Sequence, residues 1–203
     1  MKITDRSFFE KDGITLAKSL LGKYLVHISN GIKLSGKIVE TEAYMGGIDK
    51  GSHAYNYKKT KRNIVMYKDG GTAYIYLIYG MYNCMNVVAS KEGNPEAVLI
   101  RAVQPVDGID QMSKLRYNRE VSSLKKKQLI NIANGPGKLC IALDIDRKLN
   151  GSDLMFDDFY VDSAGCEKFE IASAKRINID YAEEAKDYLW RFYIKGNPYV
   201  SVK

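Results

Sequence analysis

An Asn-Gly pair at residues 30–31 restricts the fold class more than any other feature of the chain. Asn-Gly is the dipeptide that best adopts the left-handed backbone of a tight β-hairpin turn. The flanking segments 23–29 and 32–44 are rich in apolar and β-branched residues, so we expect each to be a strand, with Gly36 as a candidate β-bulge. Together these segments predict an antiparallel sheet.

The rest of the chain predicts more strands separated by short helices. We expect strands at 73–78, 85–89, 97–103, 154–161, 169–177 and 190–194. We expect helices at 12–21, 109–117, 123–132, 137–143 and 181–188, with Gly22 ending the first, Ser122 and Ser123 capping the third, and Pro136 opening the fourth. No linker rich in Pro, Gly or Ser divides the chain, so we expect one α+β domain over residues 1–203.

The charge balance indicates an anionic partner. Lys and Arg total 31 against 24 Asp and Glu, which gives a formal net charge of +7 and a pI near 9.1. Such a domain suits nucleic acid, a membrane surface or an acidic substrate, although a modest lysine excess is also typical of a solvated surface. The 15 Tyr, against 6 Phe and 1 Trp, suit a stacking surface, and they equally suit an ordinary β-sheet.

Several classes of protein are disfavoured by composition. The three cysteines (Cys84, Cys140 and Cys166) cannot all pair, and with the two histidines (His27 and His53) they show no metal-ligand spacing. We therefore expect no metal site, no cofactor and a reducing compartment. No apolar run approaches the length of a membrane span, and the first residues do not resemble a secretion signal, so we expect neither.

Acidic residues alternate with small or apolar ones in the segment 39–44, VETEAY. On a strand this pattern places Glu40, Glu42 and Tyr44 on one face, because side chains alternate between the two faces. If the other face is core, a carboxylate lies beside an aromatic ring, which suits a general base next to a platform for a ring-shaped substrate. The alternative is an exposed face that carries two solvated acids.

A long segment without sustained periodicity, residues 45–71, is expected to be a functional loop. It contains His53 and the basic cluster KKTKRN at 58–63. Each has a simpler interpretation, since a lone histidine is more often a structural hydrogen-bonding residue and a charge run in a loop is usually solvated.

Two further segments could serve a nucleic-acid partner. Tyr74 and Tyr76 share a face of one strand, and Tyr79-Gly80 follows where that strand should turn, so Tyr79 could project outward as a device for insertion into DNA. Residues 134–138, NGPGK, open a helix whose free N–H groups favour a phosphate. The alternatives are a tyrosine-rich strand and a plain helix start.

Taken in order, these segments resemble the 3-methyladenine (alkyladenine) DNA glycosylase family. The ordered set is LLGK at 20–23, VETEAY at 39–44, SHA at 52–54, TKRN at 60–63, YGM at 79–81, NVV at 86–88, VLIRA at 98–102, GPGKL at 135–139 and WRFY at 190–193. The resemblance spans residues 8–201 and departs from the family pattern at Lys61, where Pro is more common, and at Gly51, which is usually Ala.

The resemblance implies a role for each matching residue. Glu42 would be the general base that activates water, and Arg101 would help to hold that water and contact the DNA backbone. The walls around a flipped base would be Tyr44, His53 and Tyr76, the wedge in the duplex would be Tyr79, and the residue that disfavours normal purines would be Asn86. Phosphate or other DNA contacts would come from Lys61, Arg62, Asn63, Gly137 and Lys138.

The resemblance also implies a curved, Greek-key-like open-barrel sheet with flanking short helices, and a monofunctional DNA glycosylase of base excision repair. Its substrates would be alkylated purines in double-stranded DNA, such as 3-methyladenine and 7-methylguanine, with hypoxanthine and ethenoadenine as further candidates. We expect a cytoplasmic monomer, associated with the nucleoid in a bacterium. No lysine is an obvious Schiff-base nucleophile, Lys138 being the one tempting exception. The alternatives are a non-catalytic nucleic-acid-binding module and a small-molecule nucleoside hydrolase.

Overall fold

The computed structural model of the chain describes residues 1–163 and 167–202, so Cys166 lies outside the described residues. Its strands are β1 (Tyr24–Ser29), β2 (Ile32–Tyr44), β3 (Ala73–Ile78), β4 (Tyr82–Ala89), β5 (Glu96–Asp107), β6 (Phe159–Asp162), β7 (Ile171–Ala174) and β8 (Arg191–Ile194). Its α-helices are α1 (Gly13–Leu20), α2 (Ile109–Tyr117), α3 (Lys126–Ile130) and α4 (Pro136–Ala142). Short 3-10 helices are η1 (Arg6–Phe8), η2 (Gly46–Ile48), η3 (Tyr55–Tyr57), η4 (Ile64–Tyr67), η5 (Val121–Ser123), η6 (Arg147–Leu149) and η7 (Asp180–Asp187).

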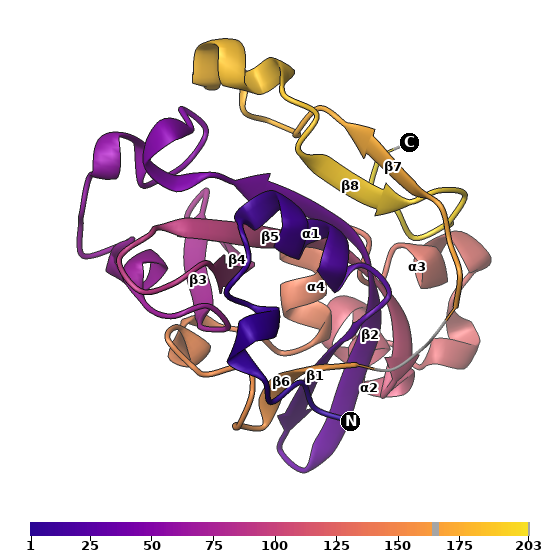
Figure 1. Ribbon diagram of the computed structural model, residues 1–203. Helices are drawn as coiled ribbons and strands as arrows, with labels where there is room; N and C mark the ends of the chain where they lie inside the picture. Colours follow the sequence, from indigo (N-terminus) through magenta and orange to yellow (C-terminus); the bar gives the residue numbers. More distant parts are fainter. Residues whose placement is uncertain (164–166, 203) are drawn as a thin grey trace.

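Within the described part of the chain, all eight strands join one antiparallel sheet in the order β3-β4-β5-β2-β1-β6, with β8 pairing to β2 and to β7. The sheet curls into a half-barrel with short helices around it (Figure 1). Strands β2 to β5 follow a Greek-key order, because the long loop after β2 carries the chain to the far edge and tight connections return β5 to pair with β2. The expected α+β class and curved antiparallel sheet are confirmed.

The Asn-Gly turn forms as expected between β1 and β2. Asn30 has φ 49° and Gly31 has φ 76°, so both central residues adopt the left-handed backbone of a type I′ turn. The ladder with β5 does shift register between Ser35 and Gly36, but the extra residue is Val106 on β5, so the bulge expected at Gly36 lies on the partner strand instead. A Cβ at Gly36 would lie 2.6 Å from Val103 Cγ2, so the close approach of these strands requires glycine there.

Two further irregularities in the β2–β5 ladder shape the centre of the molecule. Ile38 pairs with Val103 and Glu40 with Ala102, so Val39 is an extra residue on β2. Thr41 then pairs with Ile100, so Arg101 is an extra residue on β5. Bulges of this kind re-aim the side chains beside them.

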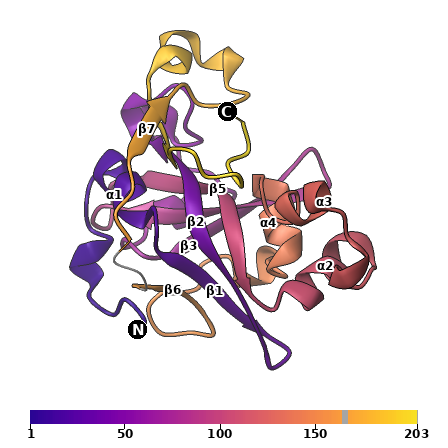
Figure 2. The same cartoon turned by 90° about the vertical axis from the view of Figure 1, so that its right-hand side faces the viewer.

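The sheet is covered on both faces along β2. Helix α1 packs against β2 and β5 with Leu16, Ala17 and Leu20 fully buried, and α4 packs against β4 and β5. Figure 2 shows α1 on one side of these strands and α2, α3 and α4 on the other. Residues 38–43 of β2 are buried on both faces, Glu40 and Glu42 included, so the alternative of an exposed strand face with solvated acids is wrong.

Several expected boundaries were wrong, mostly late in the chain. The strand expected at 154–161 begins only at Phe159, because its partner β1 pairs with four residues, Phe159 to Asp162. The strand expected at 169–177 is limited to Ile171–Ala174, where β8 pairs with it. The helix expected at 123–132 is divided into η5 and α3, with Lys125 rather than a serine at the N-cap of α3.

Other elements differ less from expectation. Strand β4 begins at Tyr82 instead of residue 85, because the preceding hairpin extends its pairing to Ile78 and Tyr82. Strand β5 continues to Asp107, since the first part of β2 remains paired with it there. The helix expected at 181–188 is the 3-10 helix η7. None of the helices in the described residues has both the length and the apolarity needed to cross a membrane.

Candidate active site

Two cavities meet at a ring of four side chains. The larger is a cleft of about 720 Å³ and the smaller a cavity of about 40 Å³. Tyr44, His53, Tyr76 and Tyr181 line both, so the two cavities adjoin at these four side chains, which we call the neck. We call the smaller one the inner cavity, because most of its other lining residues are buried. The inner cavity is further lined by Gly51, Ser52, Met66, Tyr74, Asn86 and Ala97. The cleft also has walls from the β3–β4 hairpin, the start of α4, Arg101, Arg116 and residues 177–179.

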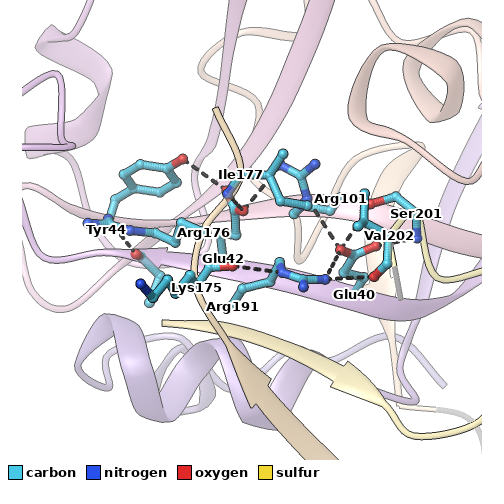
Figure 3. Close-up of polar contacts among 11 residues, drawn as sticks. Glu40, Glu42, Tyr44, Arg101, Lys175, Arg176, Ile177, Arg191, Ser201 and Val202 are labelled. Carbon is cyan, nitrogen blue, oxygen red and sulfur yellow. Dashed lines mark hydrogen bonds and ion pairs between the residues drawn. The ribbon is translucent and has the colours of Figure 1, made fainter. Parts of the chain in front are cut away.

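Glu42 lies directly behind the cleft wall and accepts three hydrogen bonds or ion contacts (Figure 3). Its Oε1 accepts from the backbone N–H of Ile177 at 2.8 Å and lies 3.2 Å from Arg101 Nη1. Its Oε2 accepts from the Tyr44 hydroxyl at 3.0 Å. Tyr44, Arg101 and Ile177 all line the cleft, so this buried carboxylate is separated from the cleft by its own partners.

Arg101 lies between two carboxylates. As the extra residue of the β5 bulge, it presents Nη1 to Glu42 at 3.2 Å and Nε to Glu40 at 3.4 Å, and its guanidinium also lines the cleft. Burial alone would lower the pKa of Arg101, but the charges of Glu42 and Glu40 outweigh it, so the pKa lies above its usual value. Arg101 therefore remains a cation beside Glu42.

All four residues of the neck carry rings, and the imidazole of His53 is uncharged at neutral pH. The rings of His53 and Tyr76 pack with their centroids 4.6 Å apart, and His53 Nδ1 lies 2.9 Å from the Tyr74 hydroxyl. Burial, together with the positive charge of Arg62, lowers the pKa of His53 to about 4. Burial also raises the pKa of Tyr44 and of Tyr76 well above the usual value, so both phenols stay protonated. A positively charged ring could enter this neck without meeting a histidine cation.

Asn86 is buried at the inner cavity, where its amide nitrogen donates to the backbone oxygen of Tyr74 at 3.1 Å. This bond orients the side chain within the wall of that cavity. Asn86 therefore lies where the end of a ring inserted through the neck would arrive.

Tyr79 lies at the tip of the β3–β4 hairpin and lines the cleft but not the inner cavity. Its side chain is 74% exposed, and it has φ 53°, followed by Gly80 at φ 70°. Met81 N donates to Ile78 O at 3.2 Å and closes the turn. Gly, Asn and Asp adopt the left-handed backbone readily, whereas a large aromatic residue is uncommon there and its backbone is strained. The turn thus holds an exposed ring at the cleft edge.

The residues expected to contact phosphate fall into three groups. Lys61 and Arg62 are exposed, and Arg62 lies over the Tyr76 ring at 4.9 Å. Gly137 and Lys138 line the cleft, and Lys138 Nζ donates to Asn131 and Asn134. Asn63, in contrast, is 1% exposed, and the expectation that its side chain contacts DNA has to be corrected.

The side chain of Asn63 is saturated by the loop that carries it. Its Oδ1 accepts from Thr60 N at 2.7 Å, and its Nδ2 donates to the backbone oxygens of His53 and Lys58, both at 2.8 Å. Asn63 therefore fixes the loop that presents Lys61 and Arg62, and positions the backbone of His53.

The part of this site that comes from residues 176–181 was not identified from the sequence. Tyr181 lines both cavities and donates its hydroxyl to Gly51 O at 3.2 Å, and Ile177 N–H holds Glu42. The buried pair of Arg176 and Asp49 joins the start of the long loop to the segment that carries Ile177. These partners are separated by 127 residues or more, so no local spacing could have revealed them.

Comparison with known proteins assigns the family. The family model described as methylpurine-DNA glycosylase matches residues 7–198. Relatives named "Putative 3-methyladenine DNA glycosylase" include one from Clostridium acetobutylicum, 57% identical over 97% of this chain and 96% of the relative. Others are from Clostridium tetani, 55% identical over the whole of both chains, and Desulfitobacterium hafniense, 50% identical over the whole of both. The chain therefore belongs to the methylpurine-DNA glycosylase family, as its motifs indicated, and is a DNA glycosylase.

Proposed function

We propose that this enzyme flips alkylated purines, such as 3-methyladenine and 7-methylguanine, out of duplex DNA and hydrolyses their N-glycosidic bond. The observation that carries the proposal is the buried Glu42, held by Arg101 and Tyr44 directly behind an aromatic neck that is open to a large cleft. The products would be the free base and an abasic site. The enzyme would act as a cytoplasmic monomer on double-stranded DNA.

Base flipping is needed because the target atom is buried inside the duplex. The exposed Tyr79 is suited to fill the gap that the extruded nucleotide leaves, since base–aromatic stacking contributes about 1–3 kcal/mol per base. Extrusion itself costs a few kcal/mol, least for a damaged base. The hairpin wedge would therefore offset much of the penalty for opening the duplex.

Recognition of the flipped base would depend on its charge. A purine alkylated at N3 or N7 is cationic, and the faces of Tyr44 and Tyr76 attract a cation by roughly 0.5–2 kcal/mol. The low pKa of His53 keeps that third wall neutral, so it does not repel the base. Asn86, fixed at the inner cavity, would contact the flipped base there and disfavour normal purines.

One carboxylate suffices for the hydrolysis of such a substrate. Glycosidases commonly need a second carboxyl group to protonate the leaving group, but an alkylated purine is already positively charged. In the proposed step, the water oxygen bonds to C1′ of the deoxyribose and one proton passes to Glu42. The C1′–N bond breaks, and its electron pair neutralises the purine. The charge of Glu42 would also stabilise the oxocarbenium-like transition state.

Strand cleavage is not part of the proposed reaction. A β-lyase would need a free amine to attack C1′, and the candidate Lys138 donates to two asparagine oxygens at 3.0 and 2.9 Å. We assign Lys138 and Gly137, at the cleft wall, to the DNA backbone, and Lys61 and Arg62 to the flanking phosphates. Arg101 would hold the water beside Glu42 and contact the backbone at the flipped nucleotide.

The test is Glu42→Gln on a duplex that contains a single 7-methylguanine. We expect no release of free base, while binding to the damaged duplex stays within a few-fold of the wild type. Glu92→Gln, at an exposed glutamate, is the matched control and should release base at the wild-type rate. Retention of base release in Glu42→Gln would contradict the assignment. Free methylated nucleosides, assayed in parallel, should not be hydrolysed; their turnover would favour a nucleoside hydrolase.

A further inference from the structure

A second buried carboxylate, Glu40, lies two residues before Glu42 on β2 and is equally inaccessible to solvent. It accepts from Arg191 Nη1 at 2.9 Å, from Ser201 N at 2.7 Å and from Ser201 Oγ at 3.0 Å. Arg101 Nε lies 3.4 Å from the same carboxylate. Figure 3 shows these groups in one row, with Arg101 between Glu40 and Glu42.

The C-terminal segment, through Ser201 and Val202, contacts the Glu40 end of this row. Arg191 Nη1 also donates to Val202 O at 3.0 Å, and Arg191 Nε donates to Lys175 O at 2.9 Å. Ser201 is bound to Glu40 through both its backbone and its side chain. Glu40 is therefore held firmly from the C-terminal side, and among the described residues it lines neither the cleft nor the inner cavity.

Two carboxylates and two guanidiniums make up the row: Glu40, Glu42, Arg101 and Arg191. Their formal charges cancel, as a buried cluster requires, because an uncompensated buried charge is strongly unfavourable. Arg101 Nε has no hydrogen-bond partner among the described residues, so Glu40 acts on Arg101 through charge. Without Glu40, Glu42 would be the only carboxylate paired with Arg101 among the described residues.

We propose that Glu40 is a positioning residue of the same reaction: anchored by Arg191 and Ser201, it holds Arg101 and prevents that cation from neutralising Glu42. This inference rests on the proposed role of Glu42 as the base. A base that is paired too strongly with a guanidinium ionises easily but accepts a proton poorly. By sharing Arg101, Glu40 would leave part of the negative charge of Glu42 available to the proton of the reacting water.

The readout is the acid limb of the pH–rate profile, where activity rises as the base ionises. The titratable and charged groups around Glu42 come from several elements: Glu40 and Tyr44 on β2, Cys84 on β4, Arg101 on β5, Arg176 and Tyr181 from the segment between β7 and β8, and Arg191 on β8. Only Glu40 and Arg191 are changed in the test, so the other groups act as a constant background.

Glu40→Gln removes one negative charge and keeps the shape of the side chain. We expect the maximal single-turnover rate of 7-methylguanine release to fall about ten- to a hundredfold, because Arg101 loses its anchor. We expect the acid limb to move to lower pH by about half a unit to one unit, because the excess positive charge favours ionised Glu42. Over a pH range in which the folded fraction is constant, as circular dichroism can check, the position of the limb does not depend on how much enzyme is folded.

Arg191→Gln removes the opposite charge and should move the acid limb in the opposite direction, to higher pH. The double variant Glu40→Gln/Arg191→Gln restores the charge balance, so its limb should return to the wild-type position while its rate stays low. Replacing both members of a buried pair is tolerated better than removing one. The double variant therefore keeps the test available if either single variant fails to fold.

The outcomes separate this inference from the proposed function. If Glu42→Gln is inactive and the acid limb is unmoved in Glu40→Gln, the role of Glu40 is wrong while the base assignment stands. A double variant with the wild-type rate would also overturn the inference, since Arg101 would then need no anchor. If Glu42→Gln remains active, the base assignment itself fails, whatever the Glu40 variants show.

Discussion

The imidazole of His53 is a neutral wall of the neck because of the surroundings that the long loop creates for it. Burial and the charge of Arg62 lower its pKa to about 4, well below the usual value of about 6.5. Its Nδ1 contacts the Tyr74 hydroxyl, and its backbone oxygen accepts from Asn63. One uncharged histidine thus links the fold of the loop to the proposed preference for a cationic base.

This arrangement makes the stability contribution of His53 dependent on pH. Below pH 6.5 the unfolded chain takes up a proton at this residue, whereas the folded chain does so only near pH 4, so folding becomes less favourable as the pH falls. Asn can replace the Nδ1 contact without titrating. We expect the unfolding free energy of the wild type to lose about 3 kcal/mol more than that of His53→Asn between pH 7 and pH 4. Denaturant titrations at both pH values measure this difference, and equal losses would contradict the buried neutral state.

At the scale of an element, the β3–β4 hairpin combines strain with exposure. Tyr79 adopts a left-handed backbone and leaves most of its ring in solvent, together with Met81 at 66% exposure. Stability alone would favour Asn or Gly at this turn position. Strain and exposed apolar surface at one tip are typical of a segment shaped by its partner.

Tyr79→Asn should therefore separate stability from DNA binding. Asn tolerates the left-handed backbone, so the unfolding free energy should stay equal or rise by about 0.5 kcal/mol. Without the ring, affinity for a damaged duplex should fall about tenfold, whereas affinity for a damaged single strand should change little. Thermal melting and fluorescence-anisotropy titrations provide the two measurements. Equal losses for duplex and single strand would show that Tyr79 is not a duplex wedge.

At the scale of the whole molecule, the net charge of +7 becomes informative only once the basic residues are placed around the cleft. Lys138 and Arg116 line the cleft itself, and Lys61 is an exposed residue of the loop that carries His53. Lys126 lies on the exposed surface of α3 and has no such position. Only part of the positive charge is therefore expected to contact phosphate.

The salt dependence of DNA binding tests which lysines contact phosphate. Each phosphate contact contributes about one to the slope of log affinity against log salt. We expect Lys61→Gln to lower that slope by about one and Lys126→Gln to leave it unchanged. The measurement is duplex binding between 50 and 200 mM salt, a range in which several contacts together change affinity by orders of magnitude. An equal effect of both substitutions would argue for a diffuse attraction instead of a defined loop contact.

The predictability of each part of the fold depended on how near its partners are in the chain. The turn at Asn30 and Gly31, strand β2 and helix α2 formed at the predicted residues, because their signals lie within the segments themselves. The strand expected at 154–161 was largely wrong, since apolar residues form a strand only where a partner strand is available to pair with them. The helix expected at 123–132 is divided into η5 and α3, so Ser122 and Ser123 lie in η5 and do not cap α3.

By itself, the sequence determined the antiparallel class of the sheet, the turn at Tyr79-Gly80 and the family, because these follow from neighbouring residues or from an ordered set of motifs. Only the tertiary structure decided that Glu40 and Glu42 are buried charges and that Asn63 serves its own loop. Three of the residues that hold the two carboxylates, Ile177, Arg191 and Ser201, lie 135, 151 and 161 residues further along the chain. An alternating strand pattern describes two faces, but whether a face meets water or guanidinium groups depends on what the folded chain packs against it.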